Sequence, residues 1–244
     1  KKNFYNKKNS KKNCKMIFFI CAPPRSGTTF LYNLLCKEKK FIYPSNFLKF
    51  FKHTLKLGFF IQNFILKKID RNEIYGKGFY GKNPGLFSPA EIGYVYRKYL
   101  KVDNRTLYKK VSKKKIKKLI EFILSIKGNN LMIIKNFYTF NFIYEIEKLN
   151  ADCKWIFLNR NINDTTRSFY KMRKKLGKEQ YPITYIKKYT DDYESIKRNI
   201  LEMKKKIKSQ KRVIKKQNYI DINFEHLIKK PIFVVNQIKK KFLN

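Results

Sequence analysis

Acidic side chains and histidines are scarce in this chain of 244 residues. It has 17 Asp and Glu residues against 58 Lys and Arg residues, and only two His. The resulting formal charge of +41 favours anionic partners such as nucleotides, acidic substrates and polyanions. Because no cluster of His, Cys and carboxylate residues has the spacing of metal ligands, we predict no metal site.

The four cysteines show no Cys-x-x-Cys spacing, and three of them lie in apolar segments. This usage predicts reduced thiols in the core and favours a cytoplasmic protein. No run of about 20 apolar residues occurs, so we expect no transmembrane segment. The chain starts at Lys1, and an anchor before that residue would make the protein membrane-associated. The cysteines are Cys14, Cys21, Cys36 and Cys153.

Apolar strand-like runs alternate with amphipathic helical segments along the chain. With 43% hydrophobic residues, the sequence can form one sizeable α/β domain over residues 1–244. Alternation predicts a central parallel sheet of about five strands flanked by helices. Residues 1–14 are basic, and we expect them to be flexible. The expected strands are 16–22, 41–43, 131–135, 154–159 and 218–222, and the expected helices are 28–37, 46–68, 89–101, 113–127, 139–149, 164–176, 184–209 and 231–242.

The most informative segment reads Pro-Pro-Arg-Ser-Gly-Thr-Thr at residues 23–29, directly after the first apolar strand. Thr28 and Thr29 begin a helix, whose free backbone N–H groups and positive dipole end face the loop. Gly27 permits close approach of the backbone, and Arg25 adds a cation. The segment therefore predicts a binding loop for phosphate or sulfate.

This loop differs from the Walker A motif, G-x-x-x-x-G-K-[ST], because Ala22 and Thr28 replace its first Gly and its Lys. It resembles instead the 5′-phosphosulfate-binding loop of the sulfotransferases, G-x-P-[RK]-S-G-T-T, with Ala22 in place of the Gly. The resemblance implies that the loop binds the 5′ side of the co-substrate 3′-phosphoadenosine 5′-phosphosulfate (PAPS) without a metal. The residues so assigned are Pro24, Arg25, Ser26, Gly27, Thr28 and Thr29.

A second segment has the composition of a phosphate site at a strand end. The apolar run 154–158 ends in Asn159-Arg160-Asn161, and Ser168 follows on the next predicted helix. An Arg fork and a hydroxyl can hold a phosphate from two sides. The segment resembles the 3′-phosphate signature of sulfotransferases, in which a Ser follows the Arg by eight residues. Arg160 is followed by Asn-Ile, where the family commonly has Asp-Pro.

Two further segments follow the order of the same family. The strand 131–135 ends at Lys135, like the family strand that delivers a Lys to the sulfonyl group. Residues 219–227, followed by Pro231, resemble the late Tyr-Glu-Asp-Leu segment. The resemblance thus covers most of residues 16–243 and implies a P-loop NTPase-like fold. Since ligands of such sheets lie at the carboxyl ends of the strands, we expect these segments to meet at one edge.

The resemblance implies transfer of a sulfonyl group from PAPS to a hydroxyl or amine. In this reading Arg25 stabilises the leaving phosphate and Lys135 the sulfonyl group. Residues 44–100 match the family least, and we expect them to form an acceptor-side insertion, with residues 70–87 as a mobile lid. Their lysines and aromatic residues suit a carbohydrate acceptor.

The general base is not evident from the sequence. Many carbohydrate and tyrosine sulfotransferases have a Glu shortly after the first helix, but residues 41–46 contain no carboxylate. His53 is the first candidate, because a neutral imidazole can accept a hydroxyl proton; a purely structural His is the alternative. Glu91 is another candidate, although Ser88-Pro89-Ala90-Glu91 also reads as a capping box with Pro at the first helical position.

Two other classes of function remain open. One is a P-loop nucleotide kinase or related phosphotransferase, and the absent Walker Lys weighs against it. The other is a non-catalytic basic module that binds nucleic acid or an acidic glycan. Because the lysines are spread along the chain without a zinc spacing or an RNA-binding signature, we expect no specific nucleic-acid partner. The sequence indicates neither the acceptor nor the oligomeric state.

Overall fold

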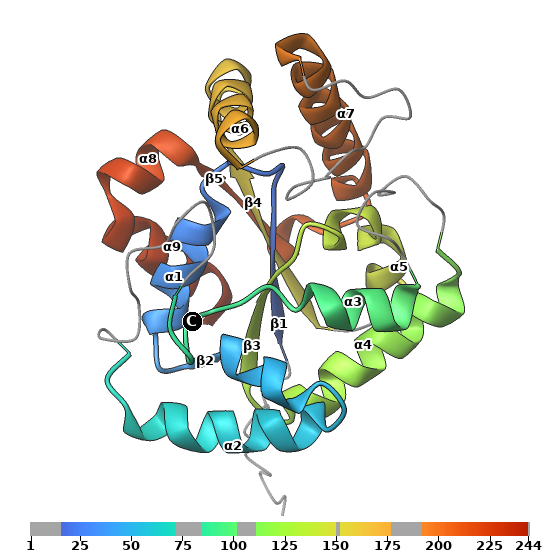
Figure 1. The fold of residues 1–244 in the computed structure, drawn as a ribbon, viewed down its shortest axis with the longest axis vertical. Coiled ribbons are helices and arrows are strands. Elements are labelled where there is room, and N and C mark those ends of the chain that lie inside the picture. The colour runs from blue at the N-terminus through green and yellow to red at the C-terminus, as the bar shows by residue number, and fades with distance from the viewer. Residues whose placement is uncertain (1–15, 72–83, 102–110, 150–151, 177–191, 244) are drawn as a thin grey trace, which may run out of the picture.

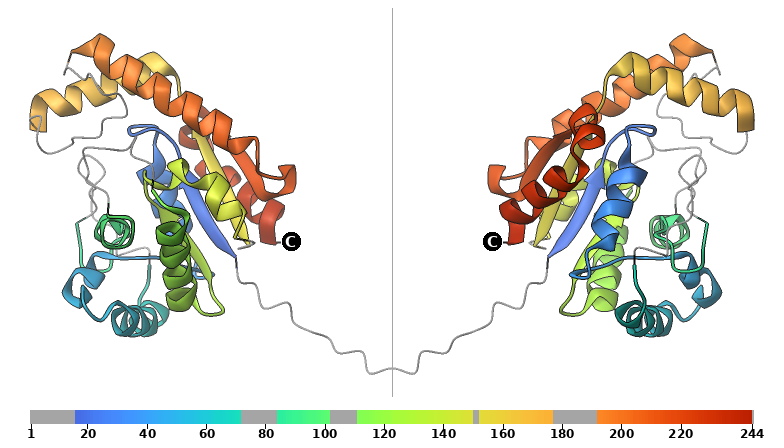
Figure 2. Two further views of the ribbon diagram at one scale, coloured as in Figure 1. Left: turned by 90° about the vertical axis from the view of Figure 1, so that its right-hand side faces the viewer. Right: turned by 90° about the vertical axis from the view of Figure 1, so that its left-hand side faces the viewer.

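The computed structural model describes residues 16–71, 84–101, 111–149, 152–176 and 192–243. Its centre is one five-stranded sheet in the order β2-β3-β1-β4-β5, with helices on both faces (Figures 1 and 2). Every strand pair is parallel, which confirms the predicted α/β fold with a central parallel sheet. The strands are β1 (Ile17–Cys21), β2 (Phe41–Ile42), β3 (Leu131–Lys135), β4 (Cys153–Asn159) and β5 (Tyr219–Asn223).

The apolar residues of β1 are buried on both sides of the sheet, as expected for a central parallel strand. Phe18 packs edge-on against Phe41 and Phe242, with α1 (Thr28–Lys37), α8 (Phe224–Lys229) and α9 (Pro231–Leu243) on that face. Phe19 stacks on Trp155 at 4.9 Å between ring centroids. The helices over that second face are α3 (Gly93–Leu100), α4 (Lys113–Lys127), α5 (Ile143–Glu147) and α7 (Tyr193–Lys211).

The helical region predicted for residues 46–68 consists of two helices. They are the 3-10 helix η1 (Asn46–Phe51) and α2 (Leu55–Lys68). A Cβ built on Gly58 would lie 2.6 Å from Cβ of Phe51. The chain therefore turns back so that η1 packs directly on the backbone of α2.

The predicted capping box at residues 88–91 does not form. Helix α3 begins at Gly93, and no side chain caps it. Residues Ser45 and Pro89 instead form an antiparallel bridge, and the backbone N–H of Ala90 donates to the carbonyl of Pro44 at 2.8 Å. The extended backbone here leaves the side chain of Glu91 available for contacts elsewhere.

Other element boundaries differ by a few residues from the predictions. The helix expected over 139–149 is the 3-10 helix η2 (Thr139–Asn141) followed by α5. Helix α6 (Ile162–Leu176) begins two residues early, and a short 3-10 helix, η3 (Lys216–Asn218), precedes β5. The predicted start of α7 at residue 184, most of the predicted lid and residues 1–14 lie outside the described residues. In the part of the chain that the structure describes, no helix is both long and apolar enough to cross a bilayer.

Three cysteines of the core carry free thiols. Cys21, Cys36 and Cys153 are buried without a disulfide. Burial raises the pKa of each thiol well above its usual range, so the thiols remain protonated. This agrees with the expected core thiols, whereas Cys14 lies outside the described residues.

The buried guanidinium of Arg71 joins three chain segments. Its Nη1 donates to the carbonyls of Cys36, Glu38 and Phe41 at 3.2, 3.0 and 2.7 Å. The last carbonyls of a helix have no partner within the helix, so Arg71 supplies the donor at the end of α1. The residue thus fixes the end of α1 and the start of β2 to the chain that leaves α2.

We expect Arg71→Met to lower the free energy of unfolding by about 3 kcal/mol, because buried carbonyl groups lose a charged donor. Urea denaturation followed by circular dichroism measures the change. The control is Arg212→Met, which removes an exposed arginine after α7 and should change stability by less than about 0.5 kcal/mol. Equal losses in the two variants would contradict the role of Arg71.

Candidate active site

The loop between β1 and α1 has two residues in the left-handed backbone region. Arg25 has φ 67° and Gly27 has φ 89°. A non-glycine residue there is uncommon and points to a functional turn. A Cβ built on Gly27 would lie 2.4 Å from Cδ2 of Phe224. Both backbone angle and space therefore require glycine at position 27, where α1 begins.

Arg160, at the end of β4, holds this loop in place. Its Nη1 donates to the carbonyl of Arg25 at 2.8 Å, and its guanidinium lies 4.2 Å from the ring centroid of Phe224. Lys204 of α7 donates in turn to the carbonyl of Arg160 at 2.6 Å. No motif in the sequence marks Lys204 as a site residue, whereas Phe224 directly follows the late strand of the family resemblance.

The two predicted phosphate segments contact each other directly. Nε of Arg25 donates to Oγ of Ser168 at 3.2 Å, although the residues are 143 positions apart. After Arg160 the chain has Asn161-Ile162, where the family commonly has Asp-Pro. The helix α6 still has a side-chain cap at its start, because Oδ1 of Asn161 accepts from the N–H of Asn163 at 2.8 Å. Asn is as good an N-cap as Asp, so α6 still presents Ser168 to the loop.

Lys135 reaches the same loop from the other side. Strand β3 pairs with β1 so that Lys135 lies opposite Ile20, and the lysine is buried. Its Nζ donates to Oγ1 of Thr29 at 2.8 Å and lies 2.5 Å from Oε1 of Glu91. Glu91, considered in the sequence as a helix cap or a base, is thus a neighbour of the lysine at the predicted sulfonyl position.

His53 lies apart from this group of residues. It is exposed in the turn between η1 and α2. Helix α2 borders a cavity together with Gly128 and Asn130, which precede β3. Helix α2 therefore lies near the edge of the sheet where the strands begin, opposite the loop between β1 and α1 (Figure 1). The predicted catalytic role of His53 has no contact with the loop or with Lys135 to support it among the described residues.

Two buried polar atoms at the site lack a hydrogen-bond partner within the described part of the chain. They are Oγ of Ser26 and Nε of Arg160. Buried polar atoms are nearly always hydrogen-bonded, and the first N–H groups of α1 lack partners within the helix. An anion in the loop would supply acceptors for these donors, so the residues present fit a phosphosulfate or phosphate group.

A cavity of about 410 Å³ adjoins the loop, between α7 and the ends of β1 and β4. The charged residues that line it are Lys204, Lys208, Lys211 and Asp221. Among these, Lys211 forms an ion pair with Asp221. Partial burial lowers the pKa of Lys204, and the carboxylate of Glu225 opposes this effect.

No group of three or more potential metal ligands occurs among the described residues.

A strand–loop–helix junction at the carboxyl edge of an all-parallel sheet defines a P-loop-like α/β fold. The model of the sulfotransferase family matches residues 18–242, and the chain belongs to this family. Family and fold together support sulfonyl transfer as the general chemistry. Comparison with curated proteins finds no match.

Solved sulfotransferase structures share the fold at low sequence identity. Sulfotransferase STF9 from Mycobacterium avium has a TM-score of 0.60 at 12% identity, over 93% of this chain and 63% of that one. Sulfotransferase STF1 from Mycobacterium tuberculosis has a TM-score of 0.56 at 13% identity, over 93% and 66% of the chains. The sulfotransferase domain of the curacin biosynthetic pathway has a TM-score of 0.50 at 17% identity, over 92% and 72%. The chain thus spans about two thirds of the mycobacterial proteins.

We expect Gly27→Ala to lower the free energy of unfolding by about 2–4 kcal/mol, since the methyl group overlaps Phe224 and the backbone is left-handed. Removing the overlap in Gly27→Ala/Phe224→Ala should recover part of the loss, so the double-mutant cycle should show coupling. Chemical denaturation measures all three variants. The control, Gly93→Ala, has ordinary backbone angles and no tight contact. Strictly additive losses would exclude the steric explanation.

Proposed function

We propose that the protein transfers a sulfonyl group from PAPS to a hydroxyl or amine of a small-molecule acceptor. The contact between Arg25 and Ser168 is the observation that carries this proposal. It supports one continuous anion site built from the 5′ loop and the Arg–Ser pair, with the two phosphate segments side by side. A kinase would need the Walker lysine, and position 28 is Thr.

Each cation of the site has a defined place relative to the loop. Loop residues Pro24 to Thr29 would hold the 5′ phosphosulfate with their backbone N–H groups and hydroxyls. Arg160 and Ser168 would bind the 3′-phosphate, and Arg25 would stabilise charge on the leaving phosphate. PAPS supplies an activated sulfonyl group, and Lys135 would offset the charge that develops on its oxygens.

Glu91 is better placed than His53 to serve as the general base. Its carboxylate lies against Nζ of Lys135, so it is close to the position assigned to the sulfonyl group. An acceptor hydroxyl that attacks there would find a proton acceptor within reach. No metal is needed for this chemistry, because preorganised cations stabilise the developing charge.

The acceptor side remains assigned to residues 44–100, with a carbohydrate as the proposed acceptor. Glu91 belongs to this segment, which supports its place beside the site. Some aromatic residues of the segment are buried in the core and others are exposed. Phe59 is an example of the first kind, and Phe60 on α2 is an example of the second. Residues 72–83, the greater part of the proposed lid, lie outside the described residues.

Donor recognition can be tested by calorimetry with 3′,5′-bisphosphoadenosine and with 5′-AMP, which lacks the 3′-phosphate. Ser168→Ala should weaken bisphosphate binding about tenfold or more, because a charge-assisted hydrogen bond is lost, and should change 5′-AMP binding little. Arg160→Ala should weaken binding of both nucleotides, and of the bisphosphate more, because Arg160 also donates to the carbonyl of Arg25 in the 5′ loop. Arg167→Ala, an exposed arginine on α6, is the control. Equal losses for both nucleotides in Ser168→Ala, or preferential binding of Mg-ATP by the unchanged protein, would contradict the PAPS assignment.

The base can be tested by transfer of radioactive sulfonate from PAPS to a panel of glycans, phenols and amines. Glu91→Gln should lower kcat by about 10²-fold or more with bisphosphate affinity unchanged. Glutamine keeps an oxygen for Lys135 but cannot take up the proton. His53→Ala is measured in parallel. A large loss in His53→Ala with normal turnover in Glu91→Gln would reverse the assignment.

A further inference from the structure

Helix α2 has apolar side chains on two opposite sides. One side is buried and includes Leu55, Phe59 and Leu66. The other carries Leu57, Phe60 and Phe64, which are 53%, 73% and 56% exposed. Their spacing of i, i+3 and i+7 places them on one helix face. We call these three residues the outer face of α2; clustered exposed apolar residues of this kind mark an interaction surface.

Lysines border the outer face on both sides. At 3.6 residues per turn, Lys56 and Lys67 fall on one side of the stripe and Lys68 on the other. Nζ of Lys68 lies 4.4 Å from the ring centroid of Phe64. The whole segment 46–68 contains five lysines and no Asp or Glu. The surface is therefore apolar along its centre and positively charged along its borders.

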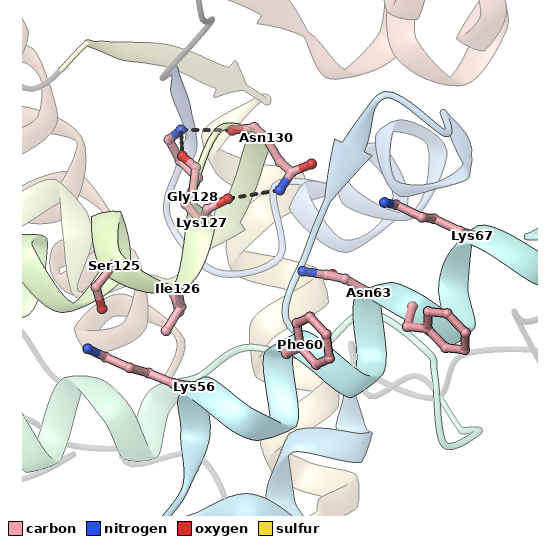
Figure 3. Close-up of a pocket in the computed structure, with 10 residues that line it drawn as sticks. Lys56, Phe60, Asn63, Lys67, Ser125, Ile126, Lys127, Gly128 and Asn130 are labelled. Carbon is pink, nitrogen blue, oxygen red and sulfur yellow. Dashed lines mark hydrogen bonds between the residues drawn. The ribbon is translucent and has the colours of Figure 1, made fainter.

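A cavity of about 420 Å³ opens beside the outer face, between α2 and the start of β3. Figure 3 shows Lys56 and Phe60 on α2 across the cavity from Ile126 and Lys127. Nζ of Lys127 donates to the carbonyls of Gly128 and Asn130, each at 2.8 Å. The described residues that line this cavity include no carboxylate, so the cavity favours an anionic group.

The combination of charge and apolar area selects among possible partners. A second copy of this chain would bring two lysine-bordered faces together, on molecules that each carry a formal charge of +41. A neutral apolar partner would remove the lysines from water without compensation. An anionic bilayer offers both acyl chains for the aromatic residues and phosphates for the lysines.

We propose that the outer face of α2 docks the protein on an anionic membrane surface, with the adjoining cavity receiving a lipid headgroup. Leu57, Phe60 and Phe64 enter the boundary between headgroups and acyl chains. Lys56, Lys67 and Lys68 lie at the depth of the phosphates. Because α2 lies near the edge where the strands begin, the loop at the opposite edge of the sheet faces away from the bilayer (Figure 1).

Co-sedimentation with vesicles of phosphatidylcholine, with and without phosphatidylserine, tests the proposal at physiological salt. Phe60→Ser/Phe64→Ser should weaken binding to the anionic vesicles at least about tenfold, since two exposed aromatic groups lose their apolar contact. The control, Ile232→Ser/Phe233→Ser, removes two residues of α9 that are 75% and 55% exposed and should change binding less than about twofold. Both pairs leave the net charge unchanged, so non-specific attraction is the same.

A fluorescent probe tests the site independently of those variants. Trp at position 60 (Phe60→Trp) should be quenched by brominated lipids in anionic vesicles, and Trp at position 233 (Phe233→Trp) should not. The native Trp155 is buried and contributes a constant background. Equal losses in the two serine pairs, or no quenching at position 60, would overturn the proposal. A dimer of this chain would also overturn the proposal if light scattering detects it, if Phe60→Ser/Phe64→Ser separates it into monomers, and if Trp at position 60 is not quenched by the lipids.

Discussion

The hydrogen bond from Arg160 to the carbonyl of Arg25 is the contact on which the candidate active site depends. It fixes a left-handed turn that would otherwise be costly for a residue with a side chain. The same guanidinium lies over Phe224, whose ring occupies the space that a side chain at position 27 would need. One arginine thus sets the positions of the β1–α1 loop, the end of β4 and the start of α8 relative to one another.

The strand order explains why the cations meet at this loop. Strand β1 lies between β3 and β4, so Lys135 and Arg160, at the ends of those strands, reach the loop from opposite sides. Arg160 contacts a carbonyl and an aromatic ring, both neutral. Its charge is therefore not cancelled by these partners and remains available for an anion. Parallel topology here brings together two basic side chains that no local sequence segment contains, and of these Lys135 is paired with Glu91.

The sequence predicts the sheet and the loop well because those signals are local. Apolar runs mark strands, and a turn with Gly27 before a helix marks the tight loop between β1 and α1. The capping box at residues 88–91 fails for the opposite reason, since the bridge between Ser45 and Pro89 overrides a local preference. Likewise, the break between η1 and α2 follows from the packing of Phe51 on Gly58. Neither tertiary contact leaves a periodic signal in the sequence.

A continuous set of contacts connects α2 to the candidate active site. Buried Gln62 of α2 accepts from Oγ of Ser45 at 2.6 Å and donates to the carbonyl of Tyr43 at 2.6 Å. Ser45 pairs with Pro89, and two residues later Glu91 contacts Lys135. The position of the proposed base therefore depends on the packing of α2, since Glu91 lies before α3, which begins at Gly93. Because the contacts of Gln62 lie on the buried side of α2, opposite Leu57, Phe60 and Phe64, one helix supports both the proposed base and the proposed membrane-docking surface.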